Sequence, residues 1–178
     1  MDLTIRTSRL LLRPQVESDI PAIVAGLNDY GVTGYLTVVP YPYTDADATA
    51  WIAMQQPARP GAAQFAIDLP GTGLIGVVGI GKELGYWLGR RHHGHGYMTE
   101  ASEALLDWHF ALLPHSVVPS GAHVGNEASL RVQKKLGFVD TGVRDMRFVA
   151  SQRREVEHVN TSLVRADFEA ARKSLRRD

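Results

Sequence analysis

Two hydrophobic patterns run along the chain, one with the two-residue period of strands and one with the period near 3.6 residues of helices. In the first run, Leu10 and Leu12 alternate with their neighbours until Pro14 ends the strand. Pro70-Gly71-Thr72-Gly73 is typical of the tight turn of a hairpin. The predicted strands span residues 3–13, 64–68, 74–80, 84–88, part of 117–124, 145–150 and 156–164.

Helices are predicted where capping residues precede amphipathic segments. Ser18 is expected to cap the first helix, and Thr44-Asp45-Ala46-Asp47 resembles a capping box that opens the second. Asn126 is expected to cap the fourth, which Gly137 closes. The predicted helices span residues 19–28, 45–54, 97–113, 127–136 and a last segment from about 167.

This order of elements indicates an α/β (α+β) protein, in which a mixed sheet carries helices on its faces. The chain has 178 residues, which is the size of one domain, and it shows no internal repeat, low-complexity tract or linker. We therefore expect a single domain over residues 1–178.

Composition and charge narrow the class of function. Nineteen Lys and Arg residues balance nineteen Asp and Glu residues, so no long-range attraction for nucleic acid or a membrane surface is expected. The chain has no Cys, which excludes disulfides, a thiolate nucleophile and a Cys-based zinc site. Its first residues lack a signal-peptide pattern, and no apolar run approaches the ~20 residues that span a bilayer. A cytoplasmic protein is therefore expected.

The candidate chemistry concentrates in residues 83–97, where a strand passes through a turn rich in Gly and His into a helix. The first N–H groups of a helix are unpaired, and Gly94 and Gly96 let the backbone wrap closely around an anion. The segment predicts a pyrophosphate site, with an ordinary glycine turn as the alternative. It matches neither a dinucleotide fingerprint, because Thr99 stands where a third glycine belongs, nor a Walker loop, which needs Gly-Lys-Ser/Thr.

Four blocks of the sequence resemble the GNAT superfamily of N-acetyltransferases. Arg91-His92-His93-Gly94-His95-Gly96 resembles its Arg/Gln-x-x-Gly-x-Gly/Ala coenzyme A signature, and the residues on both sides resemble the Rim-type branch, which includes the acetyltransferases of ribosomal-protein N-termini. Residues 126–138 are similar to that branch's Asn-x-x-Ser-x-x-x-x-x-Lys-x-Gly-Phe block. Residues 9–19 look like its opening strand and helix, and residues 162–168 like its closing pair. The blocks follow the branch's order over nearly the whole chain.

The resemblance implies a strongly twisted, mixed central sheet of about seven strands, with helices on both faces and a cleft where the fourth and fifth strands splay apart. Acetyl-CoA would be the co-substrate. Its pantetheine would pair with the backbone of Trp87 and Leu88, and its pyrophosphate would rest on the N–H groups of residues 91–96. The cofactor-binding residues expected on this basis are Trp87, Leu88, Gly89, Arg91, His92, His93, Gly94, His95, Gly96, Tyr97, Asn126, Ser129 and Lys134.

The resemblance also implies direct transfer of the acetyl group to a primary amine, either a protein N-terminus or a small molecule, in a ternary complex. The amine must lose a proton, because the pKa of an alkyl amine lies near ~10. Glu83, at the start of the fourth strand, is the first candidate base, since superfamily members often carry a glutamate there. It reads equally well as an exposed carboxylate. His123, on the fifth strand, is the second candidate unless it is buried without a catalytic role.

The predicted helix 127–136 supplies the remaining candidates. Many superfamily members carry a tyrosine acid in this helix, whereas this chain and the Rim-type branch carry serine. Ser129 is therefore expected to stabilise the leaving thiolate with a hydrogen bond. Asn126 is expected to contact the cofactor or substrate as well as cap the helix. Lys134 and Lys135 could reach the phosphates or remain solvated.

Other readings remain open at this point. His92, His93 and His95 could bind a metal, but adjacent side chains point apart and the same turn is needed for phosphate, so no metal is expected. The acceptor walls would come from residues 30–35 and 39–43. A related enzyme for small amines or antibiotics, or a non-catalytic acyl-CoA sensor or scaffold, would retain the same turn. Many superfamily members form homodimers, although no stripe in this sequence marks an interface.

Overall fold

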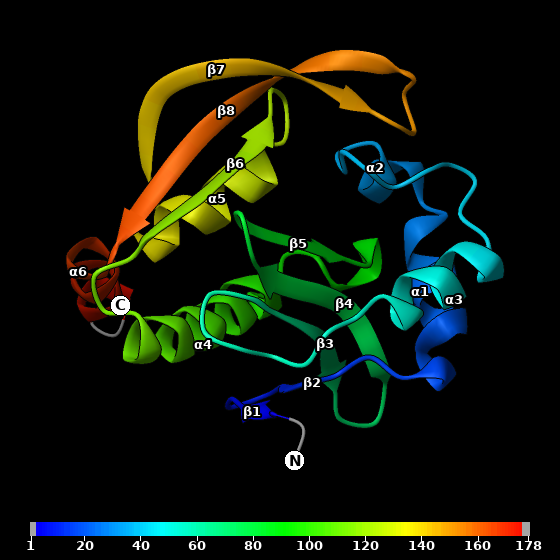
Figure 1. Cartoon of the computed structure of the whole chain (residues 1–178), viewed down its shortest axis with the longest axis horizontal. Coiled ribbons are helices and arrows are strands. Elements are labelled where there is room, and N and C mark those ends of the chain that lie inside the picture. The colour runs from blue at the N-terminus through cyan, green and yellow to red at the C-terminus, as the bar shows by residue number, and fades with distance from the viewer. Residues whose placement is uncertain (1–2, 176–178) are drawn as a thin grey trace.

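The structure, a computed structural model, describes residues 3–175, whose strands form two antiparallel sheets (Figure 1). The first sheet contains, in spatial order, β1 (Ile5–Arg6), β2 (Leu11–Arg13), β3 (Ala63–Leu69), β4 (Gly73–Ile80) and β5 (Leu84–Leu88). The second contains, in spatial order, β6 (Val117–His123), β8 (Arg154–Val164) and β7 (Val139–Val149). β5 and β6 lie next to each other without pairing, so one edge of β5 has no partner strand within residues 3–175.

Helices cover both faces of the first sheet and flank the second. They are α1 (Ile20–Leu27), α2 (Tyr30–Thr33), α3 (Asp45–Ala53), α4 (Tyr97–Leu112), α5 (Glu127–Leu136) and α6 (Arg165–Leu175). α1 packs on β4 from one side and α4 from the other, while α5 packs on β6 and α6 on β8 (Figure 1). No helix within residues 3–175 combines the length and the apolar character that a membrane crossing requires.

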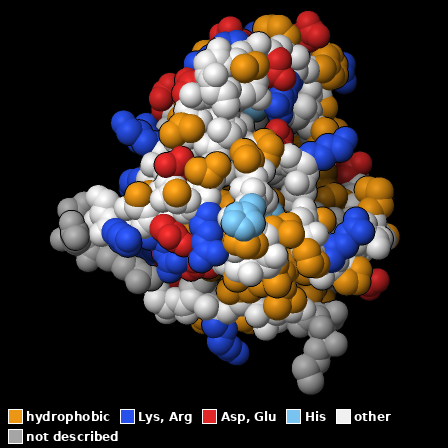
Figure 2. Space-filling view, turned by 60° about the vertical axis from the view of Figure 1, so that its left-hand side comes forward, with side chains coloured by type: hydrophobic (Ala, Val, Ile, Leu, Met, Phe, Trp, Pro, Cys, Tyr) orange, Lys and Arg blue, Asp and Glu red, His pale blue; other side chains and the backbone are white. Residues whose placement is uncertain are grey.

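Successive side chains of β4 point to opposite faces of the sheet and so belong to two different hydrophobic cores. Val78 faces the larger core beneath α4, with Phe65 and Leu105, whereas Val77 faces the smaller core beneath α1 and α3, with Ile23. The sheet is thus buried on both faces, and the expected α/β architecture is confirmed. On the face shown in Figure 2, basic and acidic side chains are interspersed, in keeping with the balanced charge.

Two of the predicted helix ends are confirmed. Thr44 and Asp47 form the reciprocal capping box at the start of α3. Gly137 ends α5 with φ of 94°, in the left-handed region that glycine adopts without strain. The predicted N-cap Ser18 is wrong, because the Asp19 side chain instead accepts a hydrogen bond from the backbone N–H of Val16 at 2.9 Å. Aspartate and serine side chains can both accept a hydrogen bond from a backbone N–H at such a turn.

The single strand predicted over residues 3–13 is also wrong. β1 and β2 are separate strands joined by a turn, in which the N–H of Thr7 donates to the Leu10 carbonyl at 3.0 Å. The carboxylate of Glu100, far along the chain in α4, accepts hydrogen bonds from Thr7 and Ser8 and pins this turn. A contact between distant segments therefore overrides the local pattern. In addition, β7 begins at Val139 rather than at 145, and the one-turn helix α2 is too short to give a periodic signal.

Candidate functional site

The junction between β5 and β6 is fastened at one end. Ser120 of β6 is buried, and its hydroxyl donates a hydrogen bond of 2.9 Å to the carbonyl of Leu84 at the start of β5. Beyond this contact the backbone of β5 pairs with β4 on one edge and with no strand on the other, within the described residues. Apart from the Leu88 carbonyl, which is bonded to His93, the main-chain groups on that part of the free edge are available to a ligand.

The residues that present these groups follow from the register of β5. The carbonyl of Trp87 points toward β4, because a Cβ placed on Gly76 would lie 2.4 Å from its oxygen. Successive residues of a strand direct their main-chain groups to opposite edges. Tyr86 and Leu88 therefore face the free edge together with Leu84. The expected main-chain contact of Trp87 is corrected to Tyr86, while that of Leu88 is retained.

Next to this edge, the turn from β5 into α4 leaves its backbone accessible. Gly94 and Gly96 adopt φ of 80° and 79°, and a Cβ on Gly94 would meet nothing within 4 Å. Gly96 is the N-cap of α4 and supplies no side chain to the first N–H groups of the helix. These groups and the helix dipole favour an anion at this position. The turn fits the pyrophosphate of the expected co-substrate.

Arg9 holds this turn from the N-terminal segment. Its guanidinium donates to the His95 carbonyl at 2.9 Å, pairs with Glu100 at 2.6 Å and lies 4.6 Å from the centre of the Tyr97 ring. Burial alone would raise the pKa of Glu100, but hydrogen bonds from Thr7 and Arg9 hold it below its ordinary value. No short-range pattern in the sequence connects Arg9 to this turn, so its contacts there are not predictable from the opening strand alone.

The basic side chains of the turn differ in what they contact. The Nε2–H of His93 donates to the carbonyl of Leu88 at 2.7 Å, at the free edge of β5. Arg91 donates to Nε2 of His92 at 3.0 Å, and burial and then the charge of Arg91 lower the pKa of His92. Arg91, His93 and His95 are exposed. Within residues 3–175, no three His, Asp or Glu side chains gather as a metal site would require.

A chain of polar side chains crosses the junction behind the free edge. The Tyr86 hydroxyl lies 2.9 Å from the hydroxyl of Ser129, which also accepts a hydrogen bond of 3.2 Å from the amide of Gln133. Gln133 is buried and donates to the Gly121 carbonyl at 2.8 Å, and it accepts from the Thr161 hydroxyl at 2.7 Å. Burial raises the pKa of Tyr86, so its phenol stays protonated at neutral pH. Ser129 thus lies at the junction, and its proposed contact with the leaving sulfur stays a prediction.

Tyr86 and Gln133 were missed by the sequence reasoning, although signals for both exist. Gln133 lies four residues after Ser129 and therefore on the same face of α5. Tyr86 is one residue from Trp87, on the face of β5 that points to α5. Asn126 caps α5 by accepting from the Ser129 N–H at 3.2 Å. Lys134 is exposed, and its expected contact with phosphate stays a prediction.

At the start of β5, Glu83 is held by an arginine from the second sheet. Arg147 of β7 donates to both carboxylate oxygens of Glu83, at 3.0 and 3.1 Å. Arg147 also bonds the side chain of Asn160 at 3.0 Å and that of Asp145 at 3.3 Å. The Glu83 side chain is 42% exposed and can still meet a solute. Arg147 lies 64 positions away in the sequence, so no spacing could have predicted it.

His123 is buried beside a second histidine. The rings of His123 and His158 lie 5.2 Å apart, edge to face, and the Nδ1 atoms of both lack a hydrogen-bond partner within residues 3–175. His123 Nε2 lies 3.3 Å from the hydroxyl of Thr37. Burial, reinforced by the charges of His158 and Arg147, lowers the pKa of His123. A neutral imidazole is able to accept a proton.

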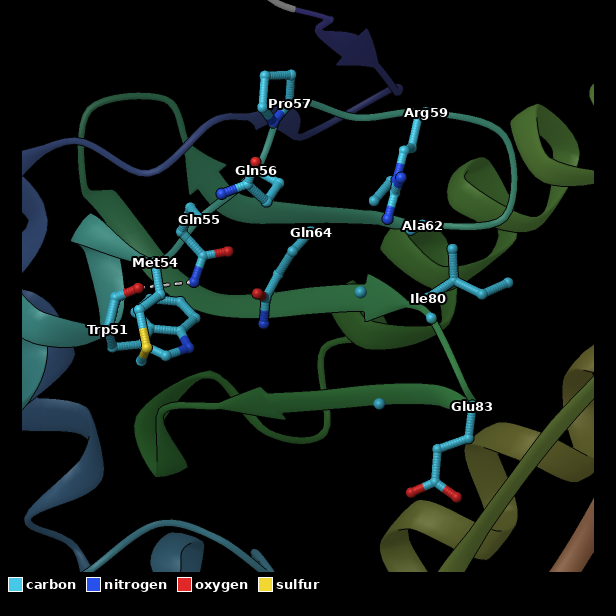
Figure 3. Close-up of a pocket in the computed structure, with 14 residues that line it drawn as sticks. Trp51, Met54, Gln55, Gln56, Pro57, Arg59, Ala62, Gln64, Ile80 and Glu83 are labelled. Carbon is cyan, nitrogen blue, oxygen red and sulfur yellow. Dashed lines mark hydrogen bonds between the residues drawn. The ribbon is translucent and has the colours of Figure 1, made fainter.

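A cavity of about 500 Å³ opens beside Glu83 on the face of the first sheet that α3 covers. Figure 3 shows Trp51, Met54 and Gln55 at one end of this cavity and Glu83 at the other. Its volume lies within the usual range of small-molecule sites. The expected acceptor walls at residues 30–35 and 39–43 do not line it; the end of α3, the loop after it and the ends of β3 and β4 do.

Comparison with known proteins agrees with this geometry. Residues 9–139 match the model of the acetyltransferase (GNAT) domain. An uncharacterised N-acetyltransferase, p20 of Bacillus licheniformis, is 29% identical over 152 residues, which cover 79% of this chain and 84% of that protein.

Solved structures with a similar fold include two acetyltransferases. A GNAT-family acetyltransferase from Bacillus anthracis aligns with a TM-score of 0.76 at 20% identity, covering 91% of this chain and 98% of that one. A spermidine N-acetyltransferase from Vibrio cholerae, solved with CoA and spermine, aligns with a TM-score of 0.73 at 18% identity, covering 92% and 99%. At such identities the likeness concerns the fold alone.

Proposed function

The chain belongs to the acetyltransferase (GNAT) family, and from this premise we propose that it transfers the acetyl group of acetyl-CoA directly to a primary amine. The observation that carries the proposal is the free edge of β5, formed by Tyr86 and Leu88, which leads to the glycine turn at the start of α4. An extended amide-bearing chain fits the edge, and a pyrophosphate fits the turn. Bound acetyl-CoA would supply a thioester that an amine can attack without a metal or a covalent enzyme intermediate.

The candidate residues have different proposed roles in the reaction. The carboxylate of Glu83, oriented by Arg147, is the first candidate to attract the ammonium form of the acceptor and to take its proton, directly or through water. Neutral His123 is the second candidate. Ser129, aligned by Tyr86 and Gln133, donates a hydrogen bond to the leaving sulfur.

The finer assignment is to the Rim-type branch, whose acceptors include protein N-termini. It rests on the block from Asn126 to Phe138, in which serine replaces the tyrosine acid of other superfamily members. The hydroxyl of Ser129 lies 2.9 Å from that of Tyr86, so β5 supplies a phenol beside this serine.

The first test is the melting temperature with saturating acetyl-CoA, with NAD and ATP as controls. A ligand at one hundred times its dissociation constant adds ~2.7 kcal/mol, which corresponds to a rise of roughly 5–11 °C for a domain of this size. A rise of this order with acetyl-CoA alone supports the proposal. No rise, or an equal rise with ATP, contradicts it. Binding without turnover over a broad panel of amines would favour the sensor instead.

A further inference from the structure

At the end away from Glu83, the cavity is lined by both apolar and polar side chains. Trp51 and Met54 at the end of α3 contribute apolar surface, and Met54 is 68% exposed. Gln56 and Gln64 contribute side-chain amides with no hydrogen-bond partner among the described residues, while Gln55 donates to the Trp51 carbonyl at 2.9 Å (Figure 3). Unpaired amides next to an apolar wall suit a ligand that carries both peptide groups and a hydrophobic side chain.

The charged side chains of the cavity disfavour a polycationic acceptor. Its acidic side chain is Glu83, whose two oxygens already accept hydrogen bonds from Arg147. Its basic side chain is Arg59, which is exposed at the rim. An amine that enters with further positive charges would find no second carboxylate in this lining and would be repelled by Arg59. A neutral or acidic acceptor avoids both costs.

We propose that this cavity binds the acceptor, and that the acceptor is the N-terminus of a neutral or acidic peptide with an apolar side chain after its first residue, rather than a polyamine. The inference rests on the proposed function, since it places the reacting amine near Glu83. The amine lies at the Glu83 end, the peptide groups meet Gln56 and Gln64, and the apolar side chain reaches Trp51. The acceptor therefore differs from that of the spermidine N-acetyltransferase with the same fold.

Gly85 offers a direct way to test this assignment. It lines the cavity from β5, and a Cβ built on it would meet nothing within 4 Å. Its φ is not in the left-handed region, so a side chain causes no backbone strain. Gly85→Val therefore fills the floor of the cavity while keeping a residue type that strands favour. Ala111→Leu, at an exposed position on α4, is the matched control for added volume.

The experiment measures thiol release from acetyl-CoA with three acceptors: the peptide amides Ala-Phe-Glu and Ala-Lys-Lys, and spermidine. We expect Ala-Phe-Glu to have the highest kcat/KM. In Gly85→Val its KM should rise about tenfold or more, because one extra methylene in an apolar pocket can already cost about tenfold and valine adds three carbons. The KM for acetyl-CoA should be unchanged, and Ala111→Leu should behave like the wild type.

Two results would overturn the acceptor assignment while leaving acetyl transfer intact. One is spermidine or Ala-Lys-Lys acting as well as Ala-Phe-Glu. The other is an unchanged peptide KM in a folded Gly85→Val variant that still binds acetyl-CoA. Failure of the wild type to bind acetyl-CoA is a separate outcome, since it would overturn the proposed function itself.

Discussion

The Ser129 hydroxyl at the junction has two neighbours, one on its own helix and one on β5. Ser129 can donate a directed hydrogen bond because the Gln133 amide already donates to its oxygen at 3.2 Å and the Tyr86 phenol lies 2.9 Å away. Both neighbours orient the hydroxyl, and burial keeps the phenol protonated by raising its pKa. The serine is therefore preorganised rather than free to rotate.

Replacing this serine tests its role. Ser129→Ala is expected to lower kcat by a factor on the order of 10 to 100, because a hydrogen bond to a charged group is worth ~1.5–3 kcal/mol. The KM for acetyl-CoA should change much less, since the interaction strengthens as the sulfur becomes negative. Steady-state kinetics with Tyr86→Phe as a companion separate the two hydroxyls. An unchanged kcat in Ser129→Ala would reduce the serine to a packing role.

At this scale the sequence predicts the residues that are proposed to carry the chemistry, but it does not reveal the residues that hold them in place. Ser129 and Glu83 were predicted from the resemblance, and Gly94 from the demands of anion binding. Arg147 was not, because a salt bridge across 64 positions leaves no local trace. Gln133 could have been found from its helical spacing relative to Ser129.

Among the elements, α5 connects helix capping to the reaction centre. The side chain of Asn126 accepts from the N–H of Ser129, so one contact both starts the helix and sets the position of the serine. Gln133, one turn further on, fastens the same helix to β6 through the Gly121 carbonyl. A disturbance at the cap is therefore transmitted to the hydroxyl.

This arrangement separates a structural role of Asn126 from a binding role. Asn126→Ala should cost ~1 kcal/mol of stability, or about 2–4 °C in melting temperature, because a good cap is lost. Asn126→Asp should restore the melting temperature, since Asp caps helices as well as Asn. If Asp also restores kcat/KM, the residue acts through the cap alone. If Asn126→Asp has wild-type stability but low activity, the amide of Asn126 itself contacts the cofactor or the substrate.

Element prediction succeeded where the signal is local. The capping box at Thr44 and the left-handed Gly137 each depend on a few neighbouring residues, and both are confirmed. The split between β1 and β2 depends instead on Glu100, some ninety positions later, which captures the turn at Thr7. Pattern alone could not reveal that contact.

For the molecule as a whole, buried histidines make stability depend on pH. Burial, the largest cause in each case, lowers the pKa of His109, His123 and His158 below the ordinary value near 6.5. The folded state thus binds fewer protons than the unfolded state once the pH falls below about 6.5. Stability contributed by the neutral imidazoles is present above that pH and is lost progressively as the pH falls toward the lowered values.

We expect the melting temperature to be nearly constant between pH 7 and 8 and to decline from about pH 6.5 to 5, before most carboxylates titrate. Scanning calorimetry over this range measures the decline. His109→Asn should reduce its slope, because the Nδ1 atom of His109 is buried without a partner within residues 3–175. A flat profile down to pH 5 would show that these histidines keep ordinary pKa values.

The division of the molecule into two sheets has one further consequence, which concerns aggregation. A strand edge with unpaired backbone groups is a template on which strands of other molecules can add. This fold keeps such an edge on β5 for its ligand, but places β6 alongside it and fastens the two at Ser120. The edge strand of another folded sheet cannot pair with β5 because β6 lies alongside it. A single extended chain, by contrast, can enter between β5 and β6. The same arrangement that admits a ligand therefore hinders edge-to-edge pairing with another copy at β5.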